Sequence, residues 1–293
     1  MKNILVTGGT GFIGSHTCIS LIENGYDLTI IDNNINSSPV SLDRIKLITE
    51  SRFQNSKILF EKGDIRDRDF LKNVFLKAIN RNCPIEAVIH FAGLKAVGES
   101  VFNPLLYWDN NVTGSICLLD VMNSFDCRTI VFSSSATVYG YVNSSPILED
   151  FNIVPENPYG KTKATVEFIL EDIFKSNKKI WKIASLRYFN PIGAHESGLL
   201  GEEPNDVPNN LFPIICKVAQ QKIKKLMIFG KDWPTKDGTG IRDYIHVMDL
   251  ADSHKSALEY LFKNQSQYIS LNIGTGFGTS VLELVQKFIE VNG

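Results

Sequence analysis

A glycine-rich turn near the N-terminus limits the fold of this chain more than any other sequence feature. The short apolar run at 4–7 leads directly into GGTGFIG at 8–14, and a helical pattern over 15–24 then ends before Gly25. Gly25 is the residue at which a left-handed helix cap is expected. The glycines of the turn recur every three residues: Gly8, Gly11 and Gly14. Such spacing allows a tight turn between a strand and a closely packed helix, and predicts the first β–α unit of a layered α/β fold.

The same alternation of strand and helix continues to about residue 188. Short β-rich apolar runs are predicted as strands at 4–7, 28–32, 58–61, 87–92, 130–134 and 183–188. Near-continuous apolar strands that alternate with helices indicate a parallel sheet covered on both faces. Two of the intervening segments, 104–124 and 159–177, are long enough to be principal helices. The fold class predicted is α/β, with a doubly wound parallel sheet of the Rossmann type.

Beyond residue 190 the sequence changes in texture. Proline and glycine are crowded into 190–213, where no regular element can run far. We then expect an apolar helix at 212–221, a short strand at 226–229, a loop rich in Gly and Asp, and a helix at 248–262. The prediction is a Rossmann domain at 1–189, rejoined by part of 235–265, and a smaller, irregular lobe at 190–293.

Charge and cysteine usage exclude several classes of partner. The chain has 30 Lys and Arg against 32 Asp and Glu, so its formal net charge of −2 offers no positive field for nucleic acid or an anionic membrane. Its 5 cysteines are well separated and form no CxxC pair, so neither a disulfide framework nor a metal site is expected. No apolar run approaches the ~18 residues of a membrane span or suits a signal peptide. We therefore expect a soluble, untargeted, cytoplasmic protein.

An acidic residue after the second strand predicts the ligand of the turn. Asp32 follows Gly14 by 18 residues, close to the ~20-residue interval at which a carboxylate bonds the adenosine ribose of a dinucleotide. An anionic Asp32 repels a 2′-phosphate, and no Arg occurs at 33–37. The cofactor expected is NAD(H) rather than NADP(H). The alternative is a tight β–α turn without a ligand.

A serine, a tyrosine and a lysine form the second candidate constellation. Tyr159 and Lys163 are four residues apart and therefore project from one face of a helix. The fifth strand ends in three serines, the last of them Ser135, at the sheet edge where ligands bind. A neighbouring cation lowers the pKa of an acid by ~1 to 3 units, which would take tyrosine from ~10 toward the range of a general base. The alternative is a solvated helical pair.

Longer motifs then carry a family resemblance over nearly the whole chain. TGGTGFIGSH, GDIRD, HFAGLKAVGES, DNNVTG, FSSSATVYG, PYGKTK, RYFNPIGAH, PNNLFP and DGTGIRDYIHVMDLAD together resemble the UDP-glucose 4-epimerases. These enzymes are extended short-chain dehydrogenases/reductases. The resemblance implies a UDP-hexose substrate, oxidation at its C4 by bound NAD, rotation of the 4-keto sugar, and hydride return to the opposite face. UDP-glucose and UDP-galactose would then be interconverted without net redox change.

The resemblance also implies roles for individual residues. Tyr159 would be the catalytic base, Ser135 its partner at the O4 hydroxyl, and Lys163 the cation that bonds the nicotinamide ribose. Together, the turn and the resemblance give these cofactor-binding residues: Gly8, Gly11, Phe12, Ile13, Gly14, Asp32, Asn33, Asn34, Ile35, Asn36, Ser37, Asp64, Ile65, Phe91, Ala92, Gly93, Lys95, Asn110, Ser135, Tyr159, Lys163 and Phe189. The substrate-binding residues implied are Lys95, Ser135, Tyr159, Asn190, Asn210, Leu211, Met227, Ile228, Phe229 and Arg242.

Several of these residues have plainer interpretations. Arg242 offers a planar fork of donors that suits a diphosphate, but it could instead pair with its neighbour Asp243 at the surface. Asp64 would otherwise cap a loop, and Lys95 would be a solvated side chain. His90 and His246 lie in apolar strand-like runs, which favours structural over catalytic roles.

Two rival functions and two further expectations remain. A nucleotide-sugar 4,6-dehydratase needs an Asp-Glu pair where this chain has Ala136 and Thr137, neither of which can shuttle a proton. A non-catalytic NAD-binding protein is the rival from another class. The resemblance implies a homodimer formed through 104–124 and 159–177. It also implies further strands and a helix after residue 293, including an Arg and an Asp for uridine diphosphate, so we expect the second lobe to be incomplete.

Overall fold

The computed structural model describes residues 1–50, 56–142, 144–203, 208 and 210–292. Its centre is a seven-stranded sheet in the order β10-β6-β5-β4-β1-β2-β3, in which every neighbouring pair is parallel. The strands are β1 (Asn3–Thr7), β2 (Asp27–Asp32), β3 (Ile58–Lys62), β4 (Ile85–His90), β5 (Thr129–Ser135), β6 (Lys182–Tyr188) and β10 (Gln267–Ile273). The strand order reverses between β1 and β4, so a crevice is expected there at the carboxyl edge.

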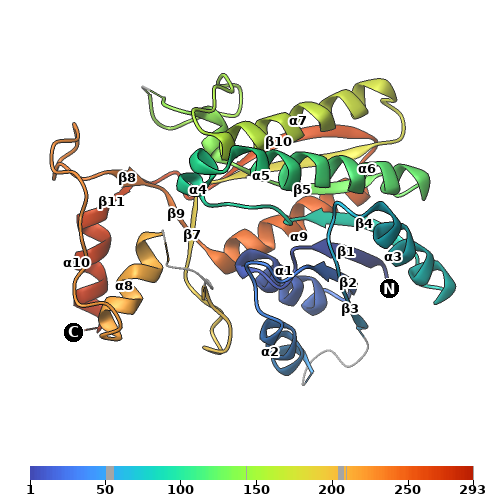
Figure 1. The fold of residues 1–293 in the computed structure, drawn as a ribbon, viewed down its shortest axis with the longest axis horizontal. Helices are drawn as coiled ribbons and strands as arrows, with labels where there is room; N and C mark the ends of the chain where they lie inside the picture. The colour runs from blue at the N-terminus through green and yellow to red at the C-terminus, as the bar shows by residue number, and fades with distance from the viewer. Residues whose placement is uncertain (51–55, 143, 204–207, 209, 293) are drawn as a thin grey trace.

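Helices cover both faces of this sheet, as Figure 1 shows. One apolar layer packs against α1 (Phe12–Glu23), α2 (Val40–Thr49) and α9 (Val247–Lys263). The other packs against α3 (Arg68–Asn80), α6 (Gly114–Ser124) and α7 (Pro158–Ser176). The predicted doubly wound sheet is therefore confirmed.

The second lobe is built from short elements that follow β6 and β10. It contains β7 (Asn190–Ile192), α8 (Leu211–Ala219), β8 (Ile241–Arg242), β9 (Tyr244–His246), β11 (Thr279–Ser280) and α10 (Val281–Asn292). Strand β7 pairs with β9, and β8 pairs with β11, in two small sheets. Figure 1 places α8, α10, β8 and β11 together, to one side of the central sheet.

Three sequence expectations need revision. The strand predicted at 226–229 is wrong: this segment is irregular, and Met227 and Phe229 are 55% and 85% exposed. Its apolar run finds no neighbouring strand among the described residues. Strand β10 was not predicted, although it pairs with β6 over seven residues. The helix expected at 104–124 consists of α5 (Pro104–Tyr107), a π-helical turn at Trp108–Thr113, and α6.

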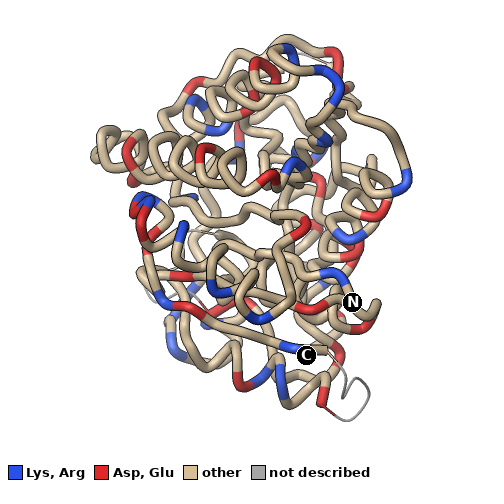
Figure 2. The backbone as a smooth tube through the Cα atoms, turned by 90° about the vertical axis from the view of Figure 1, so that its right-hand side faces the viewer, with Lys and Arg blue, Asp and Glu red and all other residues tan. Residues whose placement is uncertain are grey.

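The described helices and the distribution of charged residues can be compared with the sequence expectations. No described helix has the length and apolar character needed to cross a bilayer. In Figure 2, acidic and basic residues are interspersed along the chain, and neither sign dominates the face in view. The 5 cysteines are all unpaired thiols.

Candidate active site

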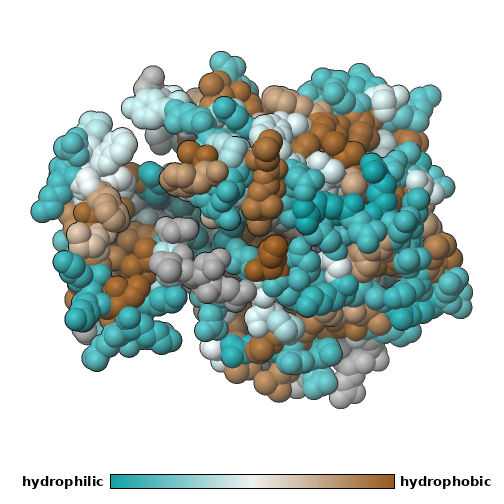
Figure 3. Space-filling model, viewed as in Figure 1, coloured by the Kyte–Doolittle hydropathy of each residue, from teal (hydrophilic) through white to brown (hydrophobic). Residues whose placement is uncertain are grey.

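A large cleft lies at the carboxyl edge of the sheet, between the two lobes, and Figure 3 shows the hollow from outside. Its volume is about 2140 Å³. Nearly all predicted cofactor residues line it, with the exceptions of Asn34 and Asp64. Of the predicted substrate residues, Met227 and Ile228 lie outside its lining. The structure thus brings most of the predicted site together from segments far apart in the sequence.

The glycine-rich turn forms a close-packed wall of this cleft. Gly8 has φ +68, and a Cβ atom there would lie 2.7 Å from the Ala92 backbone nitrogen. A Cβ on Gly14 would collide with the Gly8 carbonyl oxygen. Helix α1 begins directly after Gly11, so its free backbone N–H groups face the cleft. These glycines let the turn pack closely against the loop after β4 and place the N-terminus of α1 at the cleft, where a dinucleotide phosphate can bind.

Asp32 organises the loop after β2. Its Oδ2 accepts a hydrogen bond from the Thr10 N–H at 3.1 Å. Its Oδ1 accepts from the Asn34 N–H and from the Ser37 hydroxyl, both at 2.9 Å. The carboxylate is therefore fixed between the turn and the loop, at the lip of the cleft. This is the position that a ribose-binding carboxylate needs.

Asp64 is held differently from Asp32. The Arg66 guanidinium bonds it at 2.7 Å and keeps the pKa of the Asp64 carboxyl at about 2. Asn33 also donates to Asp64, at 3.3 Å. The structure therefore places Asp64 as an anchor for this loop, and its neighbour Ile65 reaches the cleft lining instead.

Ser135, Tyr159 and Lys163 meet at the floor of the cleft. All three side chains line the cleft and are at most 8% exposed. The Lys163 Nζ donates to the Ser133 carbonyl oxygen at 2.8 Å and lies 5.9 Å from the Tyr159 ring. The Ser135 hydroxyl shares a 2.8 Å hydrogen bond with the Thr137 hydroxyl. A hydroxyl, a phenol and an ammonium group therefore converge, as the helix spacing predicted.

The electrostatics of this group differ from the expectation. Burial raises the pKa of Tyr159, and the hydrogen bond with Ser135 only partly opposes this effect. The expected lowering by Lys163 is wrong for this arrangement, because the ammonium group is turned toward the Ser133 carbonyl. Burial also lowers the pKa of Lys163 to about 8, against the attraction of Glu167.

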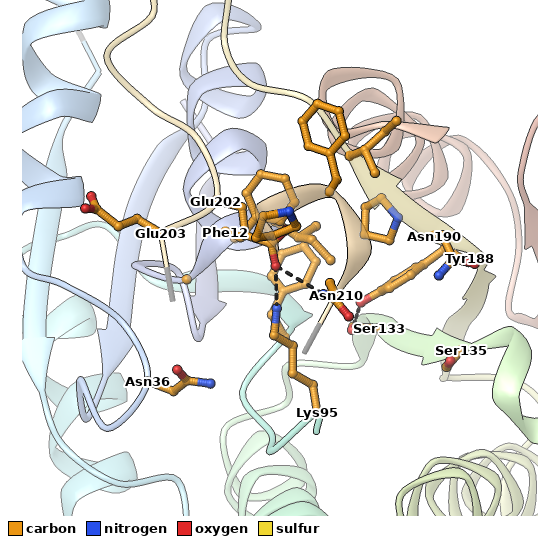
Figure 4. A pocket seen from close by; sticks show the side chains of 18 of the residues that line it. Phe12, Asn36, Lys95, Ser133, Ser135, Tyr188, Asn190, Glu202, Glu203 and Asn210 are labelled. Carbon is orange, nitrogen blue, oxygen red and sulfur yellow. Dashed lines mark hydrogen bonds and ion pairs between the residues drawn. The ribbon is translucent and has the colours of Figure 1, made fainter. Parts of the chain in front are cut away.

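An ion pair across the cleft was not predicted. Lys95, from the loop after β4, lies 3.1 Å from Glu202 Oε1, and the Asn210 amide donates to the same oxygen at 3.2 Å (Figure 4). The side chain of Glu202 is only 9% exposed. Lys95 is thus paired, while 48% of its side chain remains exposed to solvent. No sequence pattern pointed to Glu202, which lies in the irregular segment after β7.

Two further polar residues of the site were not predicted, although they lie close in the sequence to residues that were. Asn111 accepts from the Leu94 N–H at 2.7 Å and donates to the Thr162 hydroxyl at 3.0 Å, so it joins the 91–95 loop to α7. Thr137 contacts Ser135 directly. Both lie within two residues of predicted site residues, and that proximity was the available signal.

Arg242 lines the cleft and is exposed. Its guanidinium donates to the adjacent Ile241 carbonyl at 2.7 Å. Asp243 instead accepts from the backbone N–H groups of Thr275 and Gly276, at 2.9 and 2.8 Å. The alternative pairing of Arg242 with Asp243 is therefore not the arrangement seen, and the guanidinium remains available to a ligand.

The two histidines in strand-like runs have structural partners. His90 is buried between the Thr7 and Ser115 hydroxyls, at 2.7 and 2.8 Å. His246 caps α9 by accepting from the Met248 N–H at 3.2 Å. Both assignments agree with the structural roles expected for these side chains.

Burial of His90 predicts a loss of stability in acid. Burial lowers the pKa of His90 to about 3, from an ordinary value near 6.5. The unfolded chain therefore binds a proton that the folded chain excludes, and stability falls as the pH decreases from about 6.5 toward 3. Between pH 7 and 4.5, we expect the free energy of unfolding to fall about 2 kcal/mol less in His90→Gln than in the unmodified protein. Urea unfolding at several pH values measures this; equal slopes would contradict it.

Comparisons with known proteins agree with this geometry. Residues 5–291 match the family model described as GDP-mannose 4,6 dehydratase. UDP-glucose 4-epimerase of Bacillus subtilis (strain 168) is 51% identical over 290 residues, which are 99% of this chain and 82% of that protein. UDP-glucose 4-epimerase 2 of Arabidopsis thaliana is 50% identical over 100% of this chain and 81% of its own length. The chain belongs to the UDP-glucose 4-epimerase family.

Solved structures of this family share the fold. A UDP-glucose 4-epimerase from Bifidobacterium longum, in complex with NAD⁺ and UDP, superposes with a TM-score of 0.91 at 44% identity, over 100% of this chain and 84% of that one. The enzyme from Stenotrophomonas maltophila, with bound NAD and formylated UDP-arabinopyranose, gives 0.93 at 45% identity, with the same coverage. Both matches support the Rossmann-type, extended short-chain dehydrogenase/reductase fold.

Proposed function

We propose that this chain interconverts UDP-glucose and UDP-galactose by transient oxidation at C4 of the hexose, with NAD as its cofactor. The convergence of Ser135, Tyr159 and Lys163 beside the glycine-rich turn, in a member of the epimerase family, carries this proposal. The absence of an Asp-Glu pair at Ala136 and Thr137 argues against a 4,6-dehydratase. The intact constellation argues against a non-catalytic NAD-binding protein.

The residues present fit NAD. The N-terminus of α1 and the turn glycines would hold the pyrophosphate, Asp32 would accept from the adenosine ribose, and Lys163 would bond the nicotinamide ribose. When bound, NAD supplies the acceptor for the C4 hydride and returns it. The remaining contacts proposed for the cofactor are Phe12, Ile13, Asn33 to Ser37, Asp64, Ile65, Phe91 to Gly93, Lys95, Asn110 and Phe189.

The chain itself moves one proton. Tyr159 would take the proton of the O4 hydroxyl during oxidation and return it during reduction, while Ser135 holds that oxygen by a hydrogen bond. Burial lowers the pKa of Lys163 to about 8, so Lys163 would carry its charge below that pH when it bonds the nicotinamide ribose. Because proton and hydride both return, no net redox change results.

The second lobe would bind the nucleotide sugar. Arg242 offers its guanidinium to a diphosphate, for which a planar fork of donors is well suited. Lys95 would add positive charge from the opposite side of the cleft. The other residues proposed to contact the substrate are Asn190, Asn210, Leu211, Met227, Ile228 and Phe229. In this division, residues 1–189, rejoined by α9 from within 235–265, would form the NAD-binding domain, and the rest of 190–293 would form the substrate lobe.

A direct assay tests the function. The purified chain is given UDP-galactose and NAD⁺, and its products are followed by NMR and by absorbance of NADH. We expect UDP-glucose to form until both sugars are at equilibrium, without net NADH. Formation of a 4-keto-6-deoxy sugar would support a dehydratase, and NAD⁺ binding without turnover would support the non-catalytic alternative.

The unpaired cysteines support a reducing compartment, and we propose the cytoplasm.

An exposed apolar face supports a homodimer. Phe102 and Leu105, in and after α4 (Val97–Phe102), are 84% and 81% exposed, and Phe168 on α7 is 50% exposed. In Figure 3, apolar side chains gather on the part of the surface where Figure 1 places α4 to α7. Apolar patches of this kind mark association surfaces. We infer that a second copy of this chain covers them through a four-helix contact.

A charge on this face is expected to separate the dimer. Leu105→Glu would place a carboxylate in the buried interface, and we expect the dimer dissociation constant to rise at least about tenfold. Leu47→Glu is the matched control, because Leu47 is 60% exposed on α2, which covers the opposite face of the sheet. Analytical ultracentrifugation measures both variants. Equal association of the two would contradict the proposed interface.

A further inference from the structure

A buried ion pair beneath the catalytic floor joins α7 to β6. Glu167 lies one helical turn after Lys163, and its side chain is 1% exposed. Arg187 donates to both of its carboxylate oxygens, through Nε at 3.0 and 3.1 Å and through a terminal nitrogen at 2.6 Å. A pair this deeply buried contributes little net stability compared with apolar residues, so its presence calls for another explanation.

The same carboxylate also holds the end of β5. The Ser134 hydroxyl donates to Glu167 Oε1. On one side of Ser134 is Ser133, whose carbonyl oxygen accepts from Lys163 at 2.8 Å. On the other side is Ser135, which would contact the reacting hydroxyl. Glu167 therefore accepts a hydrogen bond from Ser134, the residue between Ser133 and Ser135.

Arg187 extends the contact to the surrounding loops. Its other terminal nitrogen donates to the Tyr139 hydroxyl at 2.9 Å and to the Glu149 carbonyl at 3.0 Å. Tyr139 in turn donates to Asn272 of β10 at 2.7 Å. Glu167 is thus held from several directions and cannot shift without its partners. A group fixed in this way can set the geometry of what it holds.

We propose that Glu167 is a positioning residue for the reaction: it keeps α7 in register against the end of β5, so that Tyr159 and Lys163 meet Ser135. The inference rests on the proposed function. Helix α7 carries two of the three groups and β5 carries the third. Glu167 joins these two elements through Ser134, next to the contact between Lys163 and Ser133. A misplacement of about 1 Å in such a site can cost about 10²-fold in rate.

The carboxylate also acts on the charge of Lys163. The titratable groups around Lys163 are Tyr159 and Glu167 on α7, His90 on β4 and Tyr188 on β6, while β5 presents the Phe132 ring and the Ser133 carbonyl. Of these, Glu167 raises the pKa of Lys163 against the effect of burial. If Glu167 lost its charge, Arg187 would remain nearby as an unpaired cation, and this would also favour the neutral amine of Lys163.

Two glutamates on α7 provide a matched test. Glu167→Gln keeps the shape of the side chain and removes its charge; Glu171→Gln does the same to a surface pair with Lys175 on the same helix. We expect kcat of Glu167→Gln to fall about 10²-fold, with KM within about threefold of the unmodified value. The alkaline pH at which NAD⁺ binding is lost should be roughly one unit lower in this variant than in the unmodified protein. Glu171→Gln should match the unmodified protein in all three.

Other outcomes are decisive as well. An unmodified kcat and pH profile in folded Glu167→Gln would overturn the proposal and leave the pair a purely structural role. If that variant does not fold, Ser134→Ala retains the ion pair and removes only the contact to β5; kcat should fall about tenfold, and an unchanged kcat would overturn the proposal. If the unmodified protein shows no turnover, the proposed function is contradicted, but the role of Glu167 is not. The titration of NAD⁺ binding against pH would still decide the role of Glu167.

Discussion

Tyr159→Phe is expected to lower the rate of epimerisation at least ~10²-fold, the usual contribution of a positioned general base, while NAD⁺ still binds. The substitution removes only the phenol oxygen. Since the Tyr159 side chain is buried against the cleft floor, the ring of Phe fits the same space. Lys163 keeps its hydrogen bond to the Ser133 carbonyl, so the cofactor contact proposed for it is retained.

Rate and affinity must be measured separately for this variant. Steady-state turnover of UDP-galactose gives the first, and calorimetric titration with NAD⁺ gives the second. Tyr260→Phe is the control, because Tyr260 is 48% exposed on α9, outside the cleft lining. Near-normal turnover by Tyr159→Phe would eliminate the phenol as the base. A parallel loss of NAD⁺ binding would instead assign the effect to the cofactor site.

The central sheet could be predicted because its signals are local. Strands β1 to β6 are short apolar runs bounded by turns, and all six were predicted within a few residues. Strand β10 was not predicted because polar residues, among them Ser270 and Asn272, alternate with its apolar ones, so its sequence does not form a continuous apolar run. The segment at 226–229 had that apolar pattern but no partner strand. Pairing is a property of the fold, and a short run cannot reveal it.

In the candidate site too, residues with local sequence signals were predicted and contacts that depend on the fold were not. Ser135, Tyr159 and Lys163 come from two neighbouring elements, so helix spacing and the sheet edge sufficed to bring them together. Glu202 meets Lys95 across more than 100 residues of sequence, and Glu167 on α7 meets Arg187 on β6, 20 residues further along the chain. Such partners depend on how the lobes and loops pack. Local sequence patterns hold no record of that packing.

The electrostatic prediction failed for a related reason. The sequence placed a cation one turn from Tyr159, and proximity alone suggests a lowered pKa. In the folded chain, both groups are buried, and Lys163 is directed to a backbone carbonyl. Desolvation therefore outweighs attraction. This balance is decided by orientation and burial, which the fold determines.

The second large effect is expected at the other end of the cofactor site. Asp32→Ala removes a carboxylate that already accepts from Thr10, Asn34 and Ser37, and that would accept from the adenosine ribose. NAD⁺ binding should weaken by ~1.5 to 3 kcal/mol, which is about tenfold to a hundredfold or more in dissociation constant. The preference for NAD⁺ over NADP⁺ should be smaller in the same variant, because the anion that repels a 2′-phosphate is gone.

The loop contacts of Asp32 make a second substitution necessary. Loss of three hydrogen bonds could loosen the loop at 33–37 and weaken both cofactors equally, without any direct role in recognition. Asp32→Asn lacks the charge but keeps one amide oxygen, which can accept from Asn34 and Ser37 as Oδ1 does, so it separates the two effects. NAD⁺ binding should weaken less than in the Ala variant, while NADP⁺ binding should still be strengthened. Asp69→Ala, at a 92% exposed side chain on α3, is the control for charge alone. Calorimetry with each cofactor decides the question, and a preference of the unmodified protein for NADP⁺ would refute the assignment of Asp32.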